Sequence, residues 1–156
     1  MSKIRKILAP TDYSDLSITG LRHAFEDARE TGAELIVLHV IDMGDDWFGT
    51  PKNFGPVRTL LAEQQEFLDK FLRENFAEFM NVVEVRQKVE LGTAYANIAA
   101  MAEREAVDVV MMSTHGRTGL DHVLLGSVTE KVIAHAHCPV LAIPAPKRHD
   151  TVPKAA

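Results

Sequence analysis

This chain lacks the features that define several classes of protein. Its 156 residues include one cysteine, Cys138, which has no disulfide partner within the chain, so a disulfide-rich scaffold is excluded. No apolar run approaches the ~20 residues of a membrane-spanning helix. The charged segment Met1–Lys6 is followed by three apolar residues before Pro10, too few for the hydrophobic part of a signal peptide. We therefore expect a cytoplasmic protein that does not insert into membranes.

A basic surface is missing as well. The chain has 17 lysines and arginines against 22 acidic residues, a net charge of −5. Proteins that neutralise nucleic-acid phosphates usually have a basic face and a basic pI, whereas the pI here is about 5.8. The composition argues against a nucleic-acid partner. Any bound phosphate would be held by local backbone geometry rather than by a general positive field.

The apolar pattern predicts five strands in one domain, which the length also favours. Four short runs are rich in apolar and β-branched residues and are bounded by turn residues, the pattern of strands buried on both faces. They are Ile4–Ala9, Leu35–Ile41, Val107–Met112 and Val140–Ile143. The segment Val83–Leu91 instead alternates apolar with charged or polar residues, which predicts a strand with one wet face at a sheet edge.

Helical periodicity separates the strands. The first predicted helix has Ser14 as its N-cap and Gly32 as its C-terminal stop. Apolar spacing predicts three more helices, over 61–79, over 95–102 and from Ser127 to Ala136. Strict β-α alternation predicts an α/β fold, a single doubly wound parallel sheet with helices on both faces. In such sheets, ligands bind beyond the carboxyl ends of the strands, where the strand order reverses.

Glycines and hydroxyls cluster after the fourth predicted strand. Glycine lets the backbone approach an anion closely, and three of them lie here: Gly116, Gly119 and Gly126. The helix beginning at Ser127 would add free N–H groups, and the hydroxyls of Ser127 and Thr129 could reach phosphate oxygens. The lysine of a Walker loop is missing, so nothing indicates hydrolysis. The residues fit equally well if the glycines only shape a turn and Ser127 only caps a helix.

Asp12 follows the first strand and has two readings. Its carboxylate could accept a hydrogen bond from a nucleotide, or it could cap the first helix together with Ser14; the residues alone favour capping.

The remaining candidates are weaker. His115 is the histidine that we expect nearest to a ligand, and Cys138 is expected to be an inert packed thiol. Three aromatic residues, Trp47, Phe48 and Phe54, could form a lid, a partner contact or local packing. No metal site is predicted, and no nucleophile with a base is indicated.

Several segments together resemble the universal stress protein family, in its order and spacing over residues 2–144. They are Pro10-Thr11-Asp12 with Ser14, and the segments 38–42, 113–119, 124–132 and 138–141. The resemblance implies a Rossmann-like, five-stranded parallel sheet in the order 3-2-1-4-5. It also implies homodimers that pair through the strand Val140–Ile143. A universal stress protein domain would span residues 1–144, with a flexible tail at 145–156.

The resemblance also implies an ATP site. ATP-binding members carry a glycine, two residues, a glycine, nine residues, then glycine and serine or threonine. Gly116 and Gly126-Ser127 match this pattern, whereas Ser113 replaces its first glycine. Thr11 and Asp12 would lie near the adenosine and Val40 near the adenine. The complete expected site is Pro10, Thr11, Asp12, Val40, Met112, Ser113, His115, Gly116, Gly119, Gly126, Ser127, Val128 and Thr129.

The function implied is that of a cytoplasmic, homodimeric, ATP-binding regulator of the stress response, with an unidentified protein partner. Mg²⁺ would be held mainly by the phosphates, because the sequence offers no carboxylate cluster for it. We expect no catalytic residues, and at most slow ATP hydrolysis. The alternative is a nucleotide-independent interaction protein of the same fold, which the serine at position 113 motivates.

Overall fold

The computed structural model describes residues 3–43, 54–115 and 125–146. Strands and helices alternate along these segments, as the sequence predicts. In chain order they are β1 (Lys6–Pro10), α1 (Asp15–Thr31), β2 (Glu34–Asp42), α2 (Phe54–Asn75), β3 (Val85–Gly92), α3 (Ala94–Arg104), β4 (Val109–Ser113), α4 (Ser127–His135) and β5 (Val140–Ile143). None of the helices within these described segments is long and apolar enough to cross a membrane.

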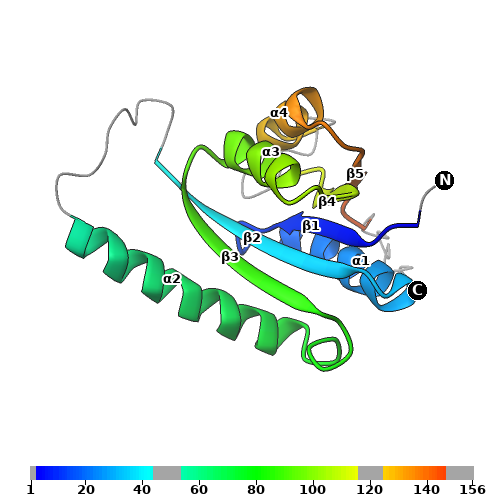
Figure 1. The fold of residues 1–156 in the computed structure, drawn as a ribbon, viewed down its shortest axis with the longest axis horizontal. Coiled ribbons are helices and arrows are strands. Elements are labelled where there is room, and N and C mark those ends of the chain that lie inside the picture. The colour runs from blue at the N-terminus through cyan, green and yellow to red at the C-terminus, as the bar shows by residue number, and fades with distance from the viewer. Residues whose placement is uncertain (1–2, 44–53, 116–124, 147–156) are drawn as a thin grey trace, which may run out of the picture.

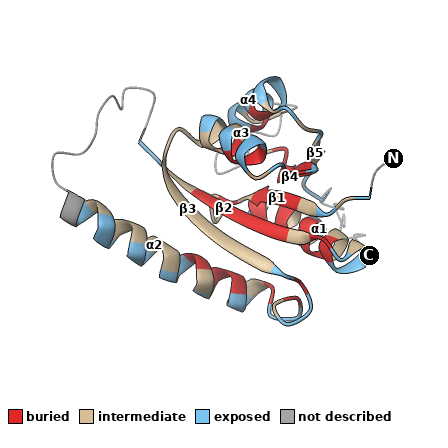
Figure 2. Cartoon of the chain, viewed as in Figure 1, coloured by how far each residue is buried: buried red, intermediate tan, exposed pale blue. Residues whose placement is uncertain are grey.

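All five strands pair in parallel, in the order β3-β2-β1-β4-β5. This confirms the predicted order, with β3 and β5 at the edges. Helices α1 and α2 cover one face of the sheet and α3 and α4 the other, and Figure 1 shows the two layers. The buried residues concentrate on the central strands (Figure 2). The chain moves from β1 to one side of the sheet and later returns to its other side at β4, so the loops after β1 and β4 flank the switch point.

Helix α1 begins and ends where the sequence predicts. The Ser14 hydroxyl accepts a hydrogen bond from the Ser17 N–H, and Gly32 ends the helix with a φ of 72°. The second helix differs from the prediction, because α2 starts at residue 54 and stops at Asn75. Phe79 therefore lies in the turn after the helix. Its ring still reaches the core and stacks on Phe25 with 5.2 Å between centroids. This burial explains why Phe79 is apolar although it lies outside the helix.

The edge strand β3 is less wet than its alternating sequence predicts. Two of its charged side chains, Arg86 and Glu90, form ion pairs with residues at the end of α3. Arg86 Nη2 lies 2.6 Å from Glu105 Oε2, and Arg104 Nη2 lies 2.6 Å from Glu90 Oε1. The whole strand is half-buried. The alternating pattern correctly predicted an edge strand. Side chains from α3, however, cover much of the face that was expected to contact solvent.

Candidate functional site

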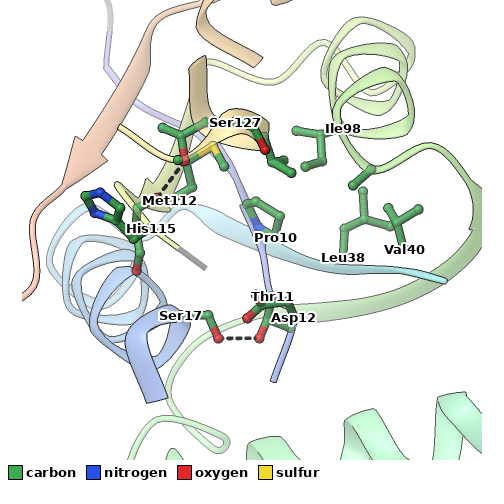
Figure 3. A pocket seen from close by; sticks show the side chains of 15 residues that line it. Pro10, Thr11, Asp12, Ser17, Leu38, Val40, Ile98, Met112, His115 and Ser127 are labelled. Atoms are coloured by element: carbon green, nitrogen blue, oxygen red, sulfur yellow. Dashed lines mark hydrogen bonds between the residues drawn. The ribbon is translucent and has the colours of Figure 1, made fainter. Parts of the chain in front are cut away.

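A cavity of about 250 Å³ lies at the carboxyl end of the sheet, beside the switch point. Its walls come from β1, α1, β2, α3, β4 and α4, and Figure 3 shows the side chains that line it. Most of the predicted site residues meet here: Pro10, Thr11, Asp12, Val40, Met112, Ser113, His115, Gly126, Ser127, Val128 and Thr129. The other two, Gly116 and Gly119, lie outside the described residues, as do Trp47 and Phe48.

Four further residues line the cavity that the sequence did not single out: Ser17, Leu38, Ala94 and Ile98. Leu38 precedes Val40 by two positions on β2, so strand alternation places both on one face and could have found it. Ser17 lies in the first turn after the predicted cap. The residues at the start of α3 carry no such signal, because only the tertiary fold brings that helix to this end of the sheet.

The cavity has an apolar end and a polar end. Figure 3 shows Leu38, Val40 and Ile98 together on one side and His115 and Ser127 on the other. Thr11 and Asp12, in the turn after β1, and Ser17, in the first turn of α1, form a further wall. A ligand with an apolar ring and a polar or anionic tail would find a matching surface along this axis.

The polar end contains the start of α4. Its N-cap, Gly126, has no side chain to cap the helix, and its own N–H donates to the Thr114 carbonyl at 2.6 Å. The N–H groups of Ser127, Val128 and Thr129 have no hydrogen-bond partner within the described part of the chain. These donors stand at the positive end of the helix dipole, which is the arrangement that binds anions. The open N–H donors are therefore those of the first helical residues, 127–129, and the N–H of Gly126 is not one of them.

The Thr129 side chain has a different role from the one expected for its hydroxyl. Thr129 is buried, and its Oγ1 donates to the Ser113 carbonyl over 2.9 Å. A threonine has one hydroxyl hydrogen, so this bond ties α4 to the end of β4 and leaves no hydrogen for a phosphate. Ser127 is exposed and its hydroxyl makes no bond to any residue that the structure describes.

Asp12 serves in the cap and in the cavity wall together. Its Oδ1 accepts hydrogen bonds from the Ser14 N–H at 3.0 Å and from the Ser14 hydroxyl at 2.5 Å. Ser14 in turn caps α1. The two readings of Asp12 are therefore not exclusive, because one oxygen supports the cap while the residue lines the cavity.

A hydroxyl pair continues this wall. Thr11 Oγ1 lies 2.9 Å from Ser17 Oγ, and Ser17 Oγ donates to the Ser14 carbonyl at 2.8 Å. Thr11 is therefore the donor to Ser17. Its oxygen also accepts the Tyr13 N–H at 3.0 Å.

An aromatic cluster supports the same turn from the side of α1 and α2. Tyr13 has a φ of 65°, a left-handed conformation that is uncommon for a tyrosine. Its ring stacks on His39 with 4.1 Å between centroids, and His39 Nδ1 donates to the Thr11 carbonyl at 2.8 Å. Burial raises the pKa of Tyr13 to about 12. The cluster thus holds the backbone of the cavity wall from behind.

Nothing among the described residues forms a protein-built metal site: no group of three or more His, Cys, Asp or Glu side chains could hold an ion. Cys138 is half-buried, and burial raises the pKa of its thiol. A raised pKa disfavours the reactive thiolate, in agreement with the prediction of a packed, inert cysteine.

The fold and the cavity define a doubly wound α/β protein with a cavity at its topological switch point, the place where such folds bind ligands. The chain belongs to the universal stress protein family, whose model matches residues 3–144. It is 37% identical over 147 residues to the universal stress protein MJ0531 of Methanocaldococcus jannaschii, covering 92% of this chain and 84% of that protein.

Two solved structures have the same fold. The structure of MJ0577 from Methanocaldococcus jannaschii has a TM-score of 0.75 at 30% identity and covers 94% of this chain and 99% of that one. A universal stress protein from Archaeoglobus fulgidus, solved in complex with dAMP, has a TM-score of 0.58 at 21% identity. That match covers 92% of this chain and 99% of the other.

Proposed function

We propose that this protein binds ATP in the cavity at the carboxyl end of the sheet and acts as a nucleotide-dependent regulator of the stress response. The observation that carries the proposal is the start of α4. Three N–H groups, at 127–129, have no hydrogen-bond partner among the residues that the structure describes, and they border a cavity whose opposite end is apolar. Phosphates would bind at the helix start and the adenine against Val40 and Ile98. The dAMP complex of the Archaeoglobus fulgidus protein supports the choice of an adenine nucleotide.

Mg²⁺ would arrive with the nucleotide and be held mainly by its phosphates. Hydrolysis would be slow or absent. A catalytic water needs a base within hydrogen-bond reach. Among the described residues of the cavity wall the one carboxylate is Asp12, and it already accepts two hydrogen bonds from Ser14 on one oxygen. Incubation with Mg-ATP should therefore release phosphate at a rate close to that of a protein-free blank. Steady release well above the blank would contradict this part of the proposal.

The domain 1–144 would form a cytoplasmic homodimer through β5. No strand within the described part of the chain pairs with the outer side of this edge strand. Leu141 on β5 is 46% exposed and Ile133 on the adjacent helix α4 is 45% exposed. An apolar surface next to an open strand edge favours pairing with a second copy. The mass of the protein in solution, measured by light scattering, should be that of a dimer.

The sharpest test of the nucleotide site is the pair Ser127→Pro and Ser127→Ala. Proline suits the first position of a helix, and the extended conformation of Gly126, with a ψ of 157°, suits the residue before a proline. Ser127→Pro therefore removes one open N–H and the hydroxyl while keeping the helix start. Ser127→Ala removes the hydroxyl alone.

We expect the unsubstituted chain to bind Mg-ATP in calorimetry, with a stabilisation of about 2.7 kcal/mol when ATP is at 100 times its dissociation constant. Ser127→Pro should bind at least about tenfold more weakly, because a hydrogen bond to a charged group contributes roughly 1.5–3 kcal/mol. Ser127→Ala should lose less. Binding by the unsubstituted chain with equal affinity in Ser127→Pro would place the ligand elsewhere. No binding at all would favour the nucleotide-independent interaction protein.

A further inference from the structure

Ser113 lies at the end of β4, between helices from opposite faces of the sheet. Its Oγ donates to the Leu16 carbonyl at 2.5 Å and accepts the Gly20 N–H at 3.0 Å. In a regular α-helix the carbonyl of residue 16 and the N–H of residue 20 bond to each other. The Ser113 hydroxyl therefore bridges two groups of α1 that belong to one turn of its hydrogen-bond ladder.

Gly20 is what allows this approach. A Cβ atom on Gly20 would lie 2.6 Å from the Ser113 nitrogen and 2.8 Å from its Oγ, both well inside ordinary contact. Helix α1 can come this close to β4 only because residue 20 has no side chain. The serine that replaces the first glycine of the phosphate-binding pattern thus has a partner glycine on the facing helix.

The other side of Ser113 is tied to α4. Its carbonyl accepts the Thr129 hydroxyl at 2.9 Å. Thr129 is in the first turn of α4, beside the open N–H groups, and it is 2% exposed. One residue therefore links the helix that carries Ser17 to the helix that carries Ser127, and these side chains stand on facing walls of the cavity.

We propose that Ser113 is a positioning residue for the nucleotide, a role that rests on the proposed function. It sets the distance between the α1 wall and the α4 wall through its side chain and its carbonyl. Its hydroxyl hydrogen is committed to Leu16, so it does not donate to a phosphate. A glycine at this position would keep the carbonyl bond to Thr129 and lose both bonds to α1. Occupancy of the cavity is thereby linked to the order of the first turns of α1.

The variant Ser113→Ala separates this role from a general contribution to stability. Without the hydroxyl, the Leu16 carbonyl and the Gly20 N–H can bond each other within α1, so little folding stability is lost. The connection between α1 and β4 disappears. A matched control is Thr31→Ala. It removes another hydroxyl-to-carbonyl bond of α1, from Thr31 Oγ1 to Asp27 at 2.7 Å, at the end of the helix that does not line the cavity.

The test is hydrogen exchange with and without Mg-ATP, together with calorimetry. In the unsubstituted chain, ATP should slow amide exchange both in α1 over residues 16–21 and at the start of α4. In Ser113→Ala the protection at α4 should remain and the protection in α1 should be lost, with binding weakened about fivefold, which is about 1 kcal/mol. Thr31→Ala should keep both the affinity and both protected segments.

The outcomes are distinct. If the unsubstituted chain binds ATP, and Ser113→Ala shows the same affinity and the same protection of α1, the positioning role of Ser113 is overturned and the proposed function stands. If the unsubstituted chain binds no adenine nucleotide, the proposed function is overturned and this role with it. If Ser113→Ala does not fold, Ser113→Gly makes the same comparison, because glycine also lacks the hydroxyl and is the residue of the family pattern.

Discussion

The two ends of the sheet are built from different chemistry. At the amino end, charged side chains pair with one another. Arg86 Nε lies 2.7 Å from Glu34 Oε1, and its Nη2 lies 2.6 Å from Glu105 Oε2. Lys6 Nζ lies 3.8 Å from Glu34 Oε2, and Asp108 accepts the N–H groups of residues 5 and 6 at 2.8 and 2.9 Å.

At the carboxyl end, neutral hydroxyls and backbone groups take the place of most charges. Thr11 pairs with Ser17, Ser113 bridges α1, and Thr129 bonds the carbonyl of Ser113. The N–H groups that begin α4 have no partner among the described residues. The charged side chains named at the amino end pair with one another. At the carboxyl end, the N–H groups at the start of α4 are left open for a ligand. Open N–H donors at a helix start favour an anionic ligand, whereas charges that are already paired do not.

The largest expected effect is a loss of folding stability in Gly20→Val, a substitution that would push α1 away from β4 at the carboxyl end of the sheet. The new side chain would overlap the Ser113 backbone nitrogen, which cannot move aside as a flexible side chain can. We expect a loss of about 3 kcal/mol in the free energy of unfolding, the upper range for overpacking. Urea denaturation measures it. His23→Val, an exposed position on the same helix, should lose far less.

The next largest effect should be a loss of nucleotide binding in Gly126→Val. The new side chain would occupy the polar end of the cavity and leave the fold intact. Gly126 has a φ of −68° and a ψ of 157°, a conformation open to any residue, so its glycine is not needed for the backbone. We expect Mg-ATP binding to weaken by at least about tenfold, with a small change in melting temperature from the poorer N-cap. Calorimetry and a thermal melt measure the two. Unchanged affinity would contradict the placement of the phosphates beside Gly126.

A smaller effect should follow from Arg86→Met at the amino end. The Arg86 guanidinium holds the pKa of Glu105 below its usual value, mainly through a hydrogen bond. The folded pKa lies below the unfolded one, so the stabilisation is present above about pH 4.3 and is lost as pH falls through the folded pKa. Both side chains contact solvent, which screens the pair. Melting curves of the two proteins should differ at pH 7 and converge in acid; a constant difference would exclude this linkage.

The smallest effect at neutral pH should come from Tyr13→Phe, at the carboxyl end of the sheet. This substitution should change the stability in alkali instead of in acid. Burial raises the pKa of Tyr13 to about 12, so its stabilising contribution is complete below the unfolded value near 10 and is lost as pH rises from 10 to 12. Its hydroxyl has no hydrogen-bond partner among the described residues, so phenylalanine costs little at pH 7. Alkaline melts should show a shallower decline for Tyr13→Phe; an identical decline would refute the assignment.

Much of the fold is readable from local patterns. The spacing of apolar runs indicates alternating strands and helices, since the period of each element is a property of its own backbone. Ser14 and Gly32 mark both ends of α1 for the same reason. The strand order 3-2-1-4-5 came instead from the resemblance of whole segments to a family. The end of α2 was placed too late, because Phe79 is buried by a turn that folds back and not by a helical face.

The glycines and hydroxyls after the first and fourth strands predict a ligand site at the carboxyl end of the sheet, because parallel strands end at the same edge. The resemblance to the family added Val40 and Met112 to the expected site. The contacts that each of these groups makes follow from the tertiary fold. The Ser113 side chain turns into α1, the Thr129 hydroxyl bonds a carbonyl, and Ile98 arrives from a distant helix. These outcomes depend on contacts between segments far apart in the chain, such as Gly20 against Ser113, whose separation no local periodicity encodes.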